Sequence, residues 1–284
     1  MKAKYIRIFS DIHLDFDIPQ KLKNFDPNDG IWTPSSMPKD KETILILAGD
    51  IWHAKKPFSF MGFSWFKKIS QQFHSVIVLL GNHDFWGGNL KTEYDSYEKF
   101  ISLQELTNVY LLQNKTIKFD GIKFVGGTLW TDFNGKNQET FYSAETTMND
   151  YKYIKNGLTF SKLKPGHIYD HFHTTLNYIK NNTTKDSETE KLWVLTHHAP
   201  SFKSIHPEYM DDGFYLMNGL YASDLEYLMT PGSNINVWVH GHCHHYQNYN
   251  INNTRIISNP RGYSFENTGY NEELLFNFSG EIVS

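Results

Sequence analysis

Short apolar runs that end abruptly in polar residues recur along this sequence of 284 residues. The clearest run, at residues 76–80, consists of Val, Ile and Leu and predicts a strand that is covered on both faces. Similar runs predict further strands at residues 5–9, 44–47, 109–112, 192–195 and 235–239.

Other patterns predict the helices and the remaining strands. Apolar positions at helical spacing indicate helices over residues 57–73, 91–106, 168–180 and, less regularly, 221–229. Asp120-Gly121 between two alternating runs predicts a tight hairpin of residues 116–119 and 122–125. Antiparallel strands are expected to close the chain at residues 246–249, 255–258 and 274–278.

Side chains suited to metal binding follow five of the predicted strands. Their blocks are Asp11-x-His13, Gly49-Asp50, Gly81-Asn82-His83-Asp84, His197-His198 and Gly241-His242-x-His244. Open α/β sheets place their ligands at the carboxyl ends of strands, so we expect these blocks to meet at one sheet edge. Asp11 and His13 lie two residues apart, so an extended backbone would point both side chains the same way. Buried carboxylates are costly unless paired or metal-bound, and five such ends therefore favour a metal site over ordinary packing.

Composition narrows the range of partners and compartments. The net charge of −4, without a long basic block, disfavours a nucleic-acid partner. The single cysteine, Cys243, forbids an internal disulfide and fits a reducing compartment. Residues 1–6 lack the apolar length of a signal peptide, and no apolar run approaches the roughly 18 residues of a membrane span. We therefore expect a soluble, cytoplasmic protein.

Taken in order, the five blocks resemble the motifs of the calcineurin-like metallophosphoesterase superfamily, over residues 11–244. The resemblance implies an α/β fold: a four-layer αββα sandwich of two mixed β-sheets flanked by helices, with a two-metal site at the carboxyl ends of strands. We expect one domain over residues 1–284, in which residues 133–166 form an insertion near the active site.

The resemblance also implies roles for the block residues. One ion would be held by Asp11, His13 and His244, and a second by Asn82, His197 and His242, with Asp50 bridging the two. His83 would protonate the leaving group or steady the phosphate, and Asp84 would orient His83. Nitrogen and oxygen ligands without thiolates suit Mn²⁺, Fe²⁺/Fe³⁺ or Zn²⁺.

Departures from the motifs narrow the subfamily. The second block lacks the arginine of the protein serine/threonine phosphatases, and His53 stands where purple acid phosphatases carry tyrosine. Arg261 is a candidate for a cation that faces the phosphate, with a simple surface turn as the alternative. His198 is a candidate for substrate contact or for a hydrogen bond that holds a metal ligand.

We therefore expect an enzyme that hydrolyses a small phosphoester or a nucleotide. Monoesters and diesters both remain open. The alternatives are a metal-dependent nuclease and an inactive, protein-binding scaffold, although scaffolds of this fold typically lose ligands and none of the seven is missing here. Four aromatic residues near the blocks either stack on a base or pack under the loops: Trp52, Phe85, Trp86 and Trp130.

Overall fold

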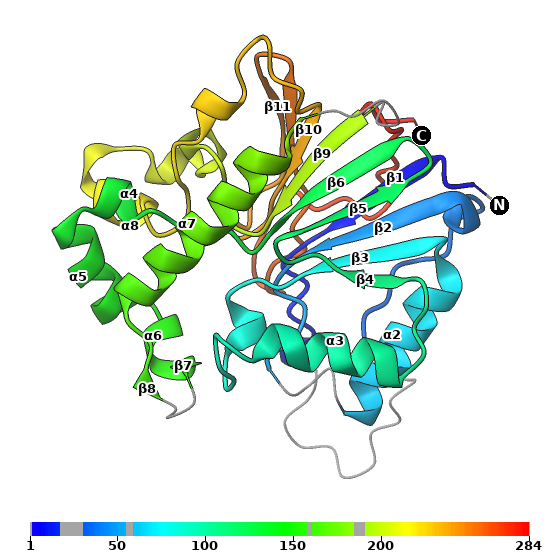
Figure 1. Ribbon diagram of the computed structural model, residues 1–284, viewed down its shortest axis with the longest axis horizontal. Coiled ribbons are helices and arrows are strands. Elements are labelled where there is room, and N and C mark those ends of the chain that lie inside the picture. Colours follow the sequence, from blue (N-terminus) through cyan, green and yellow to red (C-terminus); the bar gives the residue numbers. More distant parts are fainter. Residues whose placement is uncertain (1, 18–30, 55–58, 158–160, 185–190, 284) are drawn as a thin grey trace.

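Two β-sheets lie face to face, and helices cover their outer faces (Figure 1). This computed structural model describes residues 2–17, 31–54, 59–157, 161–184 and 191–283. The four-layer α/β sandwich expected from the resemblance is confirmed.

The first sheet carries the first three blocks. Its strand order is β1-β2-β3-β4 and all its pairings are parallel, with β1 at Tyr5–Phe9, β2 at Thr43–Ala48, β3 at Ser75–Leu79 and β4 at Val109–Leu111. The antiparallel part of the expected mixed sheet is limited to a bridge between Ile6 and Phe276 at its edge. The strand predicted at 274–278 is therefore wrong, because only Phe276 pairs with the sheet.

The second sheet is mixed and carries the last two blocks. Its order is β11-β12-β10-β9-β6-β5, with β5 at Lys115–Phe119, β6 at Ile122–Gly127, β9 at Lys191–Thr196, β10 at Val237–Val239, β11 at Gln247–Ile251 and β12 at Thr254–Ser258. The predicted hairpin at Asp120-Gly121 is confirmed: both residues have positive φ, and β5 and β6 pair antiparallel.

Alternation along the strands divides the core into layers. Ile44 and Ile46 of β2 pack between the sheets with Trp193 and Val237 of the second sheet. Leu45 and Leu47 point the other way, into the core formed with the helices. Strands buried on both faces need this continuous apolar composition, and β2 is buried at every position.

Helices α2 (Phe60–Gln72) and α3 (Glu93–Leu103) cover the first sheet, and α7 (Pro165–Asn182) covers the second (Figure 1). These three helices confirm the predictions, although residues 57–58 lie outside the described part. The helix predicted over 221–229 is wrong, because that stretch holds only a 3₁₀ turn at Glu226–Leu228. Within the described residues, no helix combines the length and the apolar character that crossing a membrane requires.

Short elements fill the remaining connections. They are α1 (Leu14–Asp17), α4 (Phe133–Lys136), α5 (Gln138–Thr147), α6 (Asp150–Tyr153), α8 (Tyr215–Asn218) and the two-stranded pair β7 (Lys155–Asn156) and β8 (Ser161–Lys162). Elements α4 to β8 lie within the stretch predicted as an insertion, residues 133–166, and that status stays a prediction. Figure 1 shows that this excursion and α8 lie together beside one end of the sheets.

Gly126 offers a test of the packing between β6 and β9. A Cβ atom there would overlap the carbonyl oxygen of Leu195, its partner on β9, so Gly126→Ala must push the two strands apart. We expect a loss of about 1–3 kcal/mol in the free energy of unfolding, measured by urea denaturation. Gly166→Ala, where nothing lies within 4 Å of the added atom, is the matched control. Equal stability of the two variants would contradict the description of this contact.

Candidate metal centre

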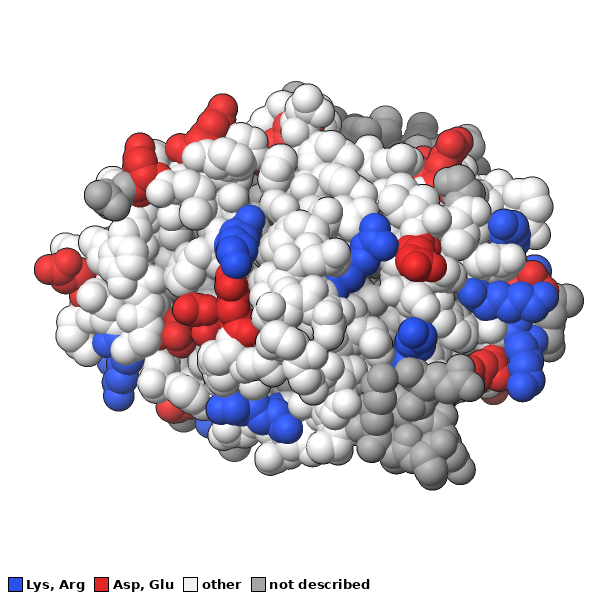
Figure 2. Space-filling model, turned by 90° about the horizontal axis from the view of Figure 1, so that it is seen from above, with Lys and Arg blue, Asp and Glu red and all other residues white. Residues whose placement is uncertain are grey.

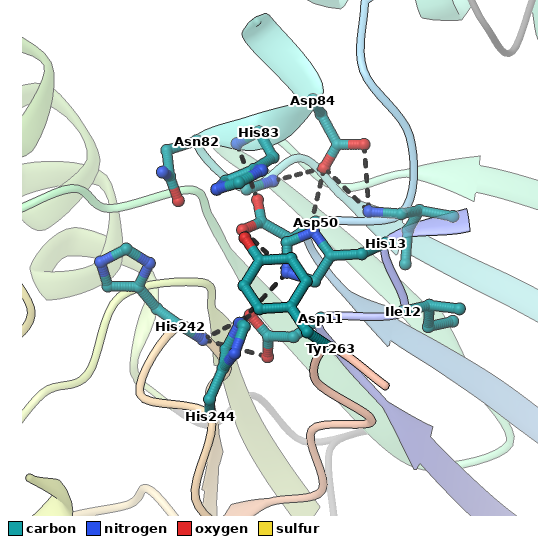
Figure 3. Close-up of polar contacts among 12 residues, drawn as sticks. Asp11, Ile12, His13, Asp50, Asn82, His83, Asp84, His242, His244 and Tyr263 are labelled. Carbon is teal, nitrogen blue, oxygen red and sulfur yellow. Dashed lines mark hydrogen bonds and ion pairs between the residues drawn. The ribbon is translucent and has the colours of Figure 1, made fainter. Parts of the chain in front are cut away.

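The five polar blocks meet where strand ends of the two sheets face each other. Asp11 and His13 follow β1, Asp50 follows β2, and the block from Asn82 follows β3. His197 follows β9, and His242 and His244 follow β10. The expected convergence is confirmed, but the centre lies between two sheets and not along the edge of one (Figure 3).

The backbone that presents several of these side chains is left-handed. Five residues of the blocks have positive φ: Asp11 (51°), His13 (48°), Asp50 (57°), His242 (67°) and His244 (44°). The expectation that an extended strand aligns Asp11 with His13 is therefore wrong, because β1 ends at Phe9. Such conformations cost about 1–3 kcal/mol each and are concentrated at functional sites. Hydrogen bonds help to hold them here, from Asp11 N to Gly49 O at 2.9 Å and from His13 N to Asp50 O at 3.0 Å.

One group of side chains consists of Asp11, His13 and His244. The Nε2 atoms of His13 and His244 lie 3.1 Å apart, and His244 Nε2 lies 3.4 Å from Asp11 Oδ1. Glu266 accepts a 2.6 Å hydrogen bond from Nδ1 of His244, which fixes the orientation of that ring. A carboxylate behind a ligating histidine is a common feature of metal sites. The sequence analysis missed Glu266, which has no motif around it.

A second group consists of Asp50, Asn82, His197 and His242. His197 Nε2 lies 3.1 Å from Asn82 Oδ1 and 3.4 Å from Asp50 Oδ1, while its Nδ1 donates to Ala48 O at 2.8 Å. The other Asp50 oxygen, Oδ2, lies 3.9 Å from His13 Nε2 in the first group. One carboxylate therefore faces both groups.

The donor atoms in these groups fit divalent ions. Asp11, His13 and His244 bring three ligand atoms within 4.8 Å of one another, and so do Asp50, His197 and His242. Nε2 of His242 is buried and has no hydrogen-bond partner among the described residues. An orphaned imidazole nitrogen beside buried carboxylates is unfavourable without a cation to bind. His13, Asp50 and His83 form a third such group, so geometry alone also permits His83 as a ligand.

Buried charges in the centre depend on one another. Burial opposes protonation of His197, but the Asp50 carboxylate more than compensates and raises the pKa of His197 to about 9. For His244, Asp11 and Glu266 likewise overcome burial and raise the pKa to about 10. Burial lowers the pKa of His13 to about 3 and that of His83 to about 4. Ligating histidines must be deprotonated, so an ion bound here would displace protons from His197 and His244.

Asp84 does not orient His83 as predicted. Its Oδ2 accepts from the backbone N–H groups of Asp50 at 2.7 Å and Gly81 at 2.8 Å. Its Oδ1 accepts from Trp52 N at 3.0 Å and Ile51 N at 3.2 Å (Figure 3). No hydrogen bond joins it to His83 within the described part of the chain. The fully buried Asp84 side chain accepts these hydrogen bonds and not one from His83. Asp84 therefore joins the loop after β2 to the loop after β3.

His83 is held by stacking and by its backbone. Its ring lies 3.6 Å from the Trp86 ring, centroid to centroid, and the planes differ by 23°. Its backbone N–H donates to Asp50 Oδ1 at 2.8 Å. The ring Nδ1 is buried and has no hydrogen-bond partner among the described residues. Trp86 is the one predicted aromatic residue that lies at the site, since Trp52, Phe85 and Trp130 are buried in the core and cannot stack on a base.

Asp150 in α6 was not predicted and connects the excursion to the centre. Its Oδ1 accepts from Asn82 Nδ2 at 2.9 Å and from Trp86 Nε1 at 2.7 Å. The first bond turns the oxygen of Asn82 towards His197, and the second fixes the indole that packs on His83. One buried carboxylate thus positions a candidate ligand and the ring beside the candidate proton donor.

Tyr263 covers the first group and was also missed as a site residue. Its ring stacks on His13 at a centroid distance of 4.5 Å, and Figure 3 shows its hydroxyl pointing towards Asp50. Burial and the nearby Asp50 carboxylate raise the pKa of Tyr263. Its backbone N–H donates to Glu266 Oε2 at 2.8 Å, so one carboxylate fixes both Tyr263 and His244.

The remaining predicted residues take supporting positions. His198 is buried and its ring lies 4.1 Å from the His242 ring, centroid to centroid, and 5.2 Å from that of Trp130. Arg261 donates to the Ile12 carbonyl at 2.9 Å, and its guanidinium lies 5.5 Å from the centre of the Trp32 ring. Those contacts brace the first block, and substrate contact by His198 or Arg261 stays a prediction.

Removing the Asp150 carboxylate tests its positioning role. We expect Asp150→Ala to weaken divalent-metal binding by about 10–100-fold, as loss of partners behind metal ligands typically does. Asp150→Asn should retain most of the affinity, because its oxygen can still accept from Asn82. Calorimetric titration with Mn²⁺ measures both, and Asp170→Ala on the exposed face of α7 is the control. Wild-type affinity in a folded Asp150→Ala variant would exclude the role.

Comparison with known proteins agrees with this geometry. The family model described as calcineurin-like phosphoesterase matches residues 5–246. An uncharacterised protein of Acanthamoeba polyphaga mimivirus, L509, is 29% identical in an alignment of 282 positions that covers 94% of this chain and 94% of L509. The crystal structure of phosphopantetheinyl hydrolase (PptH) from Mycobacterium tuberculosis shares the fold, with a TM-score of 0.64 and 16% identity over 93% of this chain and 91% of that one. The chain belongs to the calcineurin-like phosphoesterase family and is a metal-dependent phosphoesterase.

Proposed function

We propose that this enzyme hydrolyses small phosphoesters through two divalent ions. Asp11, His13 and His244 would hold one ion, Asn82, His197 and His242 would hold the other, and Asp50 would bridge them. The observation that supports this proposal is the position of the Asp50 carboxylate, whose two oxygens face the two groups at 3.4 Å and 3.9 Å.

The residues around the proposed ions have separate roles in proton transfer and in positioning. Divalent ions bound there supply positive charge that stabilises the phosphoryl oxygens and activates a water for attack. His83 lies beside Asp50, to which its backbone N–H donates, and its imidazole would exchange a proton with the leaving group. Asp84 holds the loops that carry Asp50 and Gly81, and Asp150 and Glu266 hold Asn82 and His244 in orientation.

The ligand set restricts the metal without naming it. Imidazole, carboxylate and amide donors suit Mn²⁺, Fe²⁺/Fe³⁺ or Zn²⁺. Cys243 lies between His242 and His244 in sequence, and it packs near Ala199, Ile205 and Ala222. Burial raises the pKa of its thiol, so Cys243 is not a thiolate donor at neutral pH.

The surface favours a small ester or nucleotide over nucleic acid. Acidic and basic side chains are interspersed on the face shown in Figure 2, and the net charge is −4. Nucleases bind phosphates through clustered Lys and Arg, and this face carries no such cluster. A nuclease is therefore the second candidate.

We also propose that residues 1–284 form one domain and that the enzyme works in the cytoplasm, as the single cysteine suggests.

A metal-supplemented activity screen tests the proposal. The protein is reconstituted with Mn²⁺, Fe²⁺ or Zn²⁺ and assayed with p-nitrophenyl phosphate, bis(p-nitrophenyl) phosphate and duplex DNA at matched phosphate concentration. Hydrolysis of either chromogenic ester with intact DNA supports the proposal. Cleavage of the duplex without hydrolysis of the small esters would establish the nuclease.

Replacement of Asp50 tests the bridge. We expect close to two ions per chain in the reconstituted protein, and the largest loss of activity in Asp50→Asn, because that residue touches both ions. Asp11→Ala and Asn82→Ala each remove one contact and should lose less. Elemental analysis measures the metal, with Asp170→Asn as control. A stoichiometry that never exceeds one ion, or small and equal losses in all three variants, would contradict the two-ion site.

Replacement of His83 separates proton transfer from ligation. We expect His83→Ala to keep its metal and to lose roughly 10²–10⁴-fold in turnover, the usual contribution of a general acid. The loss should shrink for esters of p-nitrophenol, because p-nitrophenolate leaves without a proton. Comparison with an alkyl ester, together with metal analysis, measures both effects. If the variant loses one equivalent of metal, His83 is a ligand, as its place in the third group permits.

A further inference from the structure

An exposed group of aromatic rings borders the metal centre. Its members are Phe16 in α1, Tyr263 and Phe265, and they are here called the aromatic rim. Phe265 is 83% exposed, the highest fraction among the exposed large apolar side chains in the described ranges, and Phe16 is 58% exposed. Full burial of such a ring would stabilise the protein by about 1.5–3 kcal/mol. The proposed hydrolysis does not explain why the rings are exposed instead.

The rim is continuous with the centre. The Tyr263 ring is near-parallel to His13, at 26°, and near-parallel to Phe265, at 18° with a centroid distance of 5.5 Å. Phe16 meets the edges of the same rings, at 5.0 Å from Tyr263 and 5.9 Å from His13. A run of stacked rings therefore leads outward from a candidate ligand to an exposed phenyl face.

The turn that carries Tyr263 and Phe265 is also held against the candidate ligands. Glu266 follows Phe265 directly, and its carboxylate binds both the Tyr263 backbone N–H and His244. Glu266 N in turn donates to Tyr263 O at 3.0 Å, which closes the turn. Gly262 N donates to Asp11 O at 2.9 Å and joins this turn to the first block. The turn that carries the Tyr263 and Phe265 rings is thus held by contacts with His244 and Asp11, two of the candidate ligands.

We propose that the aromatic rim binds the group esterified to the phosphate, and that this group is a planar aromatic ring. The inference rests on the proposed hydrolysis of phosphoesters at the centre. A phosphate bound beside His13 has its ester substituent next to Tyr263, and the open face of Phe265 extends the stack. Stacking of aromatic rings stabilises a complex by more than the burial of apolar surface alone. An aliphatic ring of equal size gains the burial but not the stacking.

Phosphonates test the rim without any reaction. Phenylphosphonate, cyclohexylphosphonate and methylphosphonate are titrated calorimetrically into the metal-loaded full-length protein. We expect the phenyl compound to bind about fivefold more tightly than the cyclohexyl compound, the size of one aromatic pair. Phe265→Leu and Phe16→Leu keep an apolar side chain but lack the ring, so each should reduce the preference. Their affinity for methylphosphonate, which reports the phosphate site alone, should be unchanged. Tyr142→Leu, at an exposed aromatic residue on α5, is the control.

The outcomes distinguish this inference from the proposed function. Equal affinities for the phenyl and cyclohexyl compounds in the wild type, or a preference that persists in Phe265→Leu and Phe16→Leu, would overturn the aromatic subsite. If methylphosphonate binds but no ester is hydrolysed, the proposed hydrolysis fails while the preference among phosphonates still decides the rim. If no phosphonate binds the metal-loaded protein, both are wrong.

Discussion

Four backbone N–H groups point at one buried carboxylate, that of Asp84, and the geometry of the metal centre depends on this arrangement. The groups belong to Gly81 and to the three residues from Asp50 to Trp52, so the carboxylate joins the ends of β2 and β3. Leaving a buried N–H without an acceptor costs about 1–3 kcal/mol. These bonds offset the left-handed backbone at Asp50 and set the direction in which its side chain leaves the sheet. The Asp50 carboxylate, which faces both groups, is therefore placed by a residue that is itself fully buried.

Two further carboxylates hold the centre from opposite groups. Glu266 fixes His244, and Asp150 fixes Asn82. Each also fixes an aromatic residue, Tyr263 in the first case and Trp86 in the second. Each carboxylate therefore links the orientation of a candidate ligand to the position of an aromatic ring beside the site. A change that moves one of the two is expected to move the other. Loss of partners of this kind typically costs about 10–100-fold in metal affinity or activity.

The sequence predicted what is local and missed what is long-range. Strands and the Asp120-Gly121 hairpin follow from alternation and turn chemistry within a few residues. The five blocks could be recognised because each lies next to a predicted strand. Asp150 and Glu266 lie in segments without periodicity, and only folding brings them behind their partners. Trp52, Phe85 and Trp130 lie next to the blocks in the sequence, but their side chains are buried in the core. Burial of large apolar rings lowers the free energy of the folded state. The left-handed backbone at Asp11 and His13 could not be predicted from the sequence either, because neither Asp nor His requires a positive φ.

The first group joins distant parts of the chain, with Asp11 and His13 near one end and His244 and Glu266 more than two hundred residues later. The strand pairings between β1 and β4 involve only residues up to Leu111, whereas β10 and the other strands that cover the inner face of this sheet are synthesised later. The site around His13 has no partner nitrogen until the block after β10 has emerged. Domains fold as their sequence becomes available, so the group of Asp11, His13 and His244 is completed only late in synthesis. A polypeptide that ends before β10 lacks His244 and cannot complete this group, even where its first strands have paired.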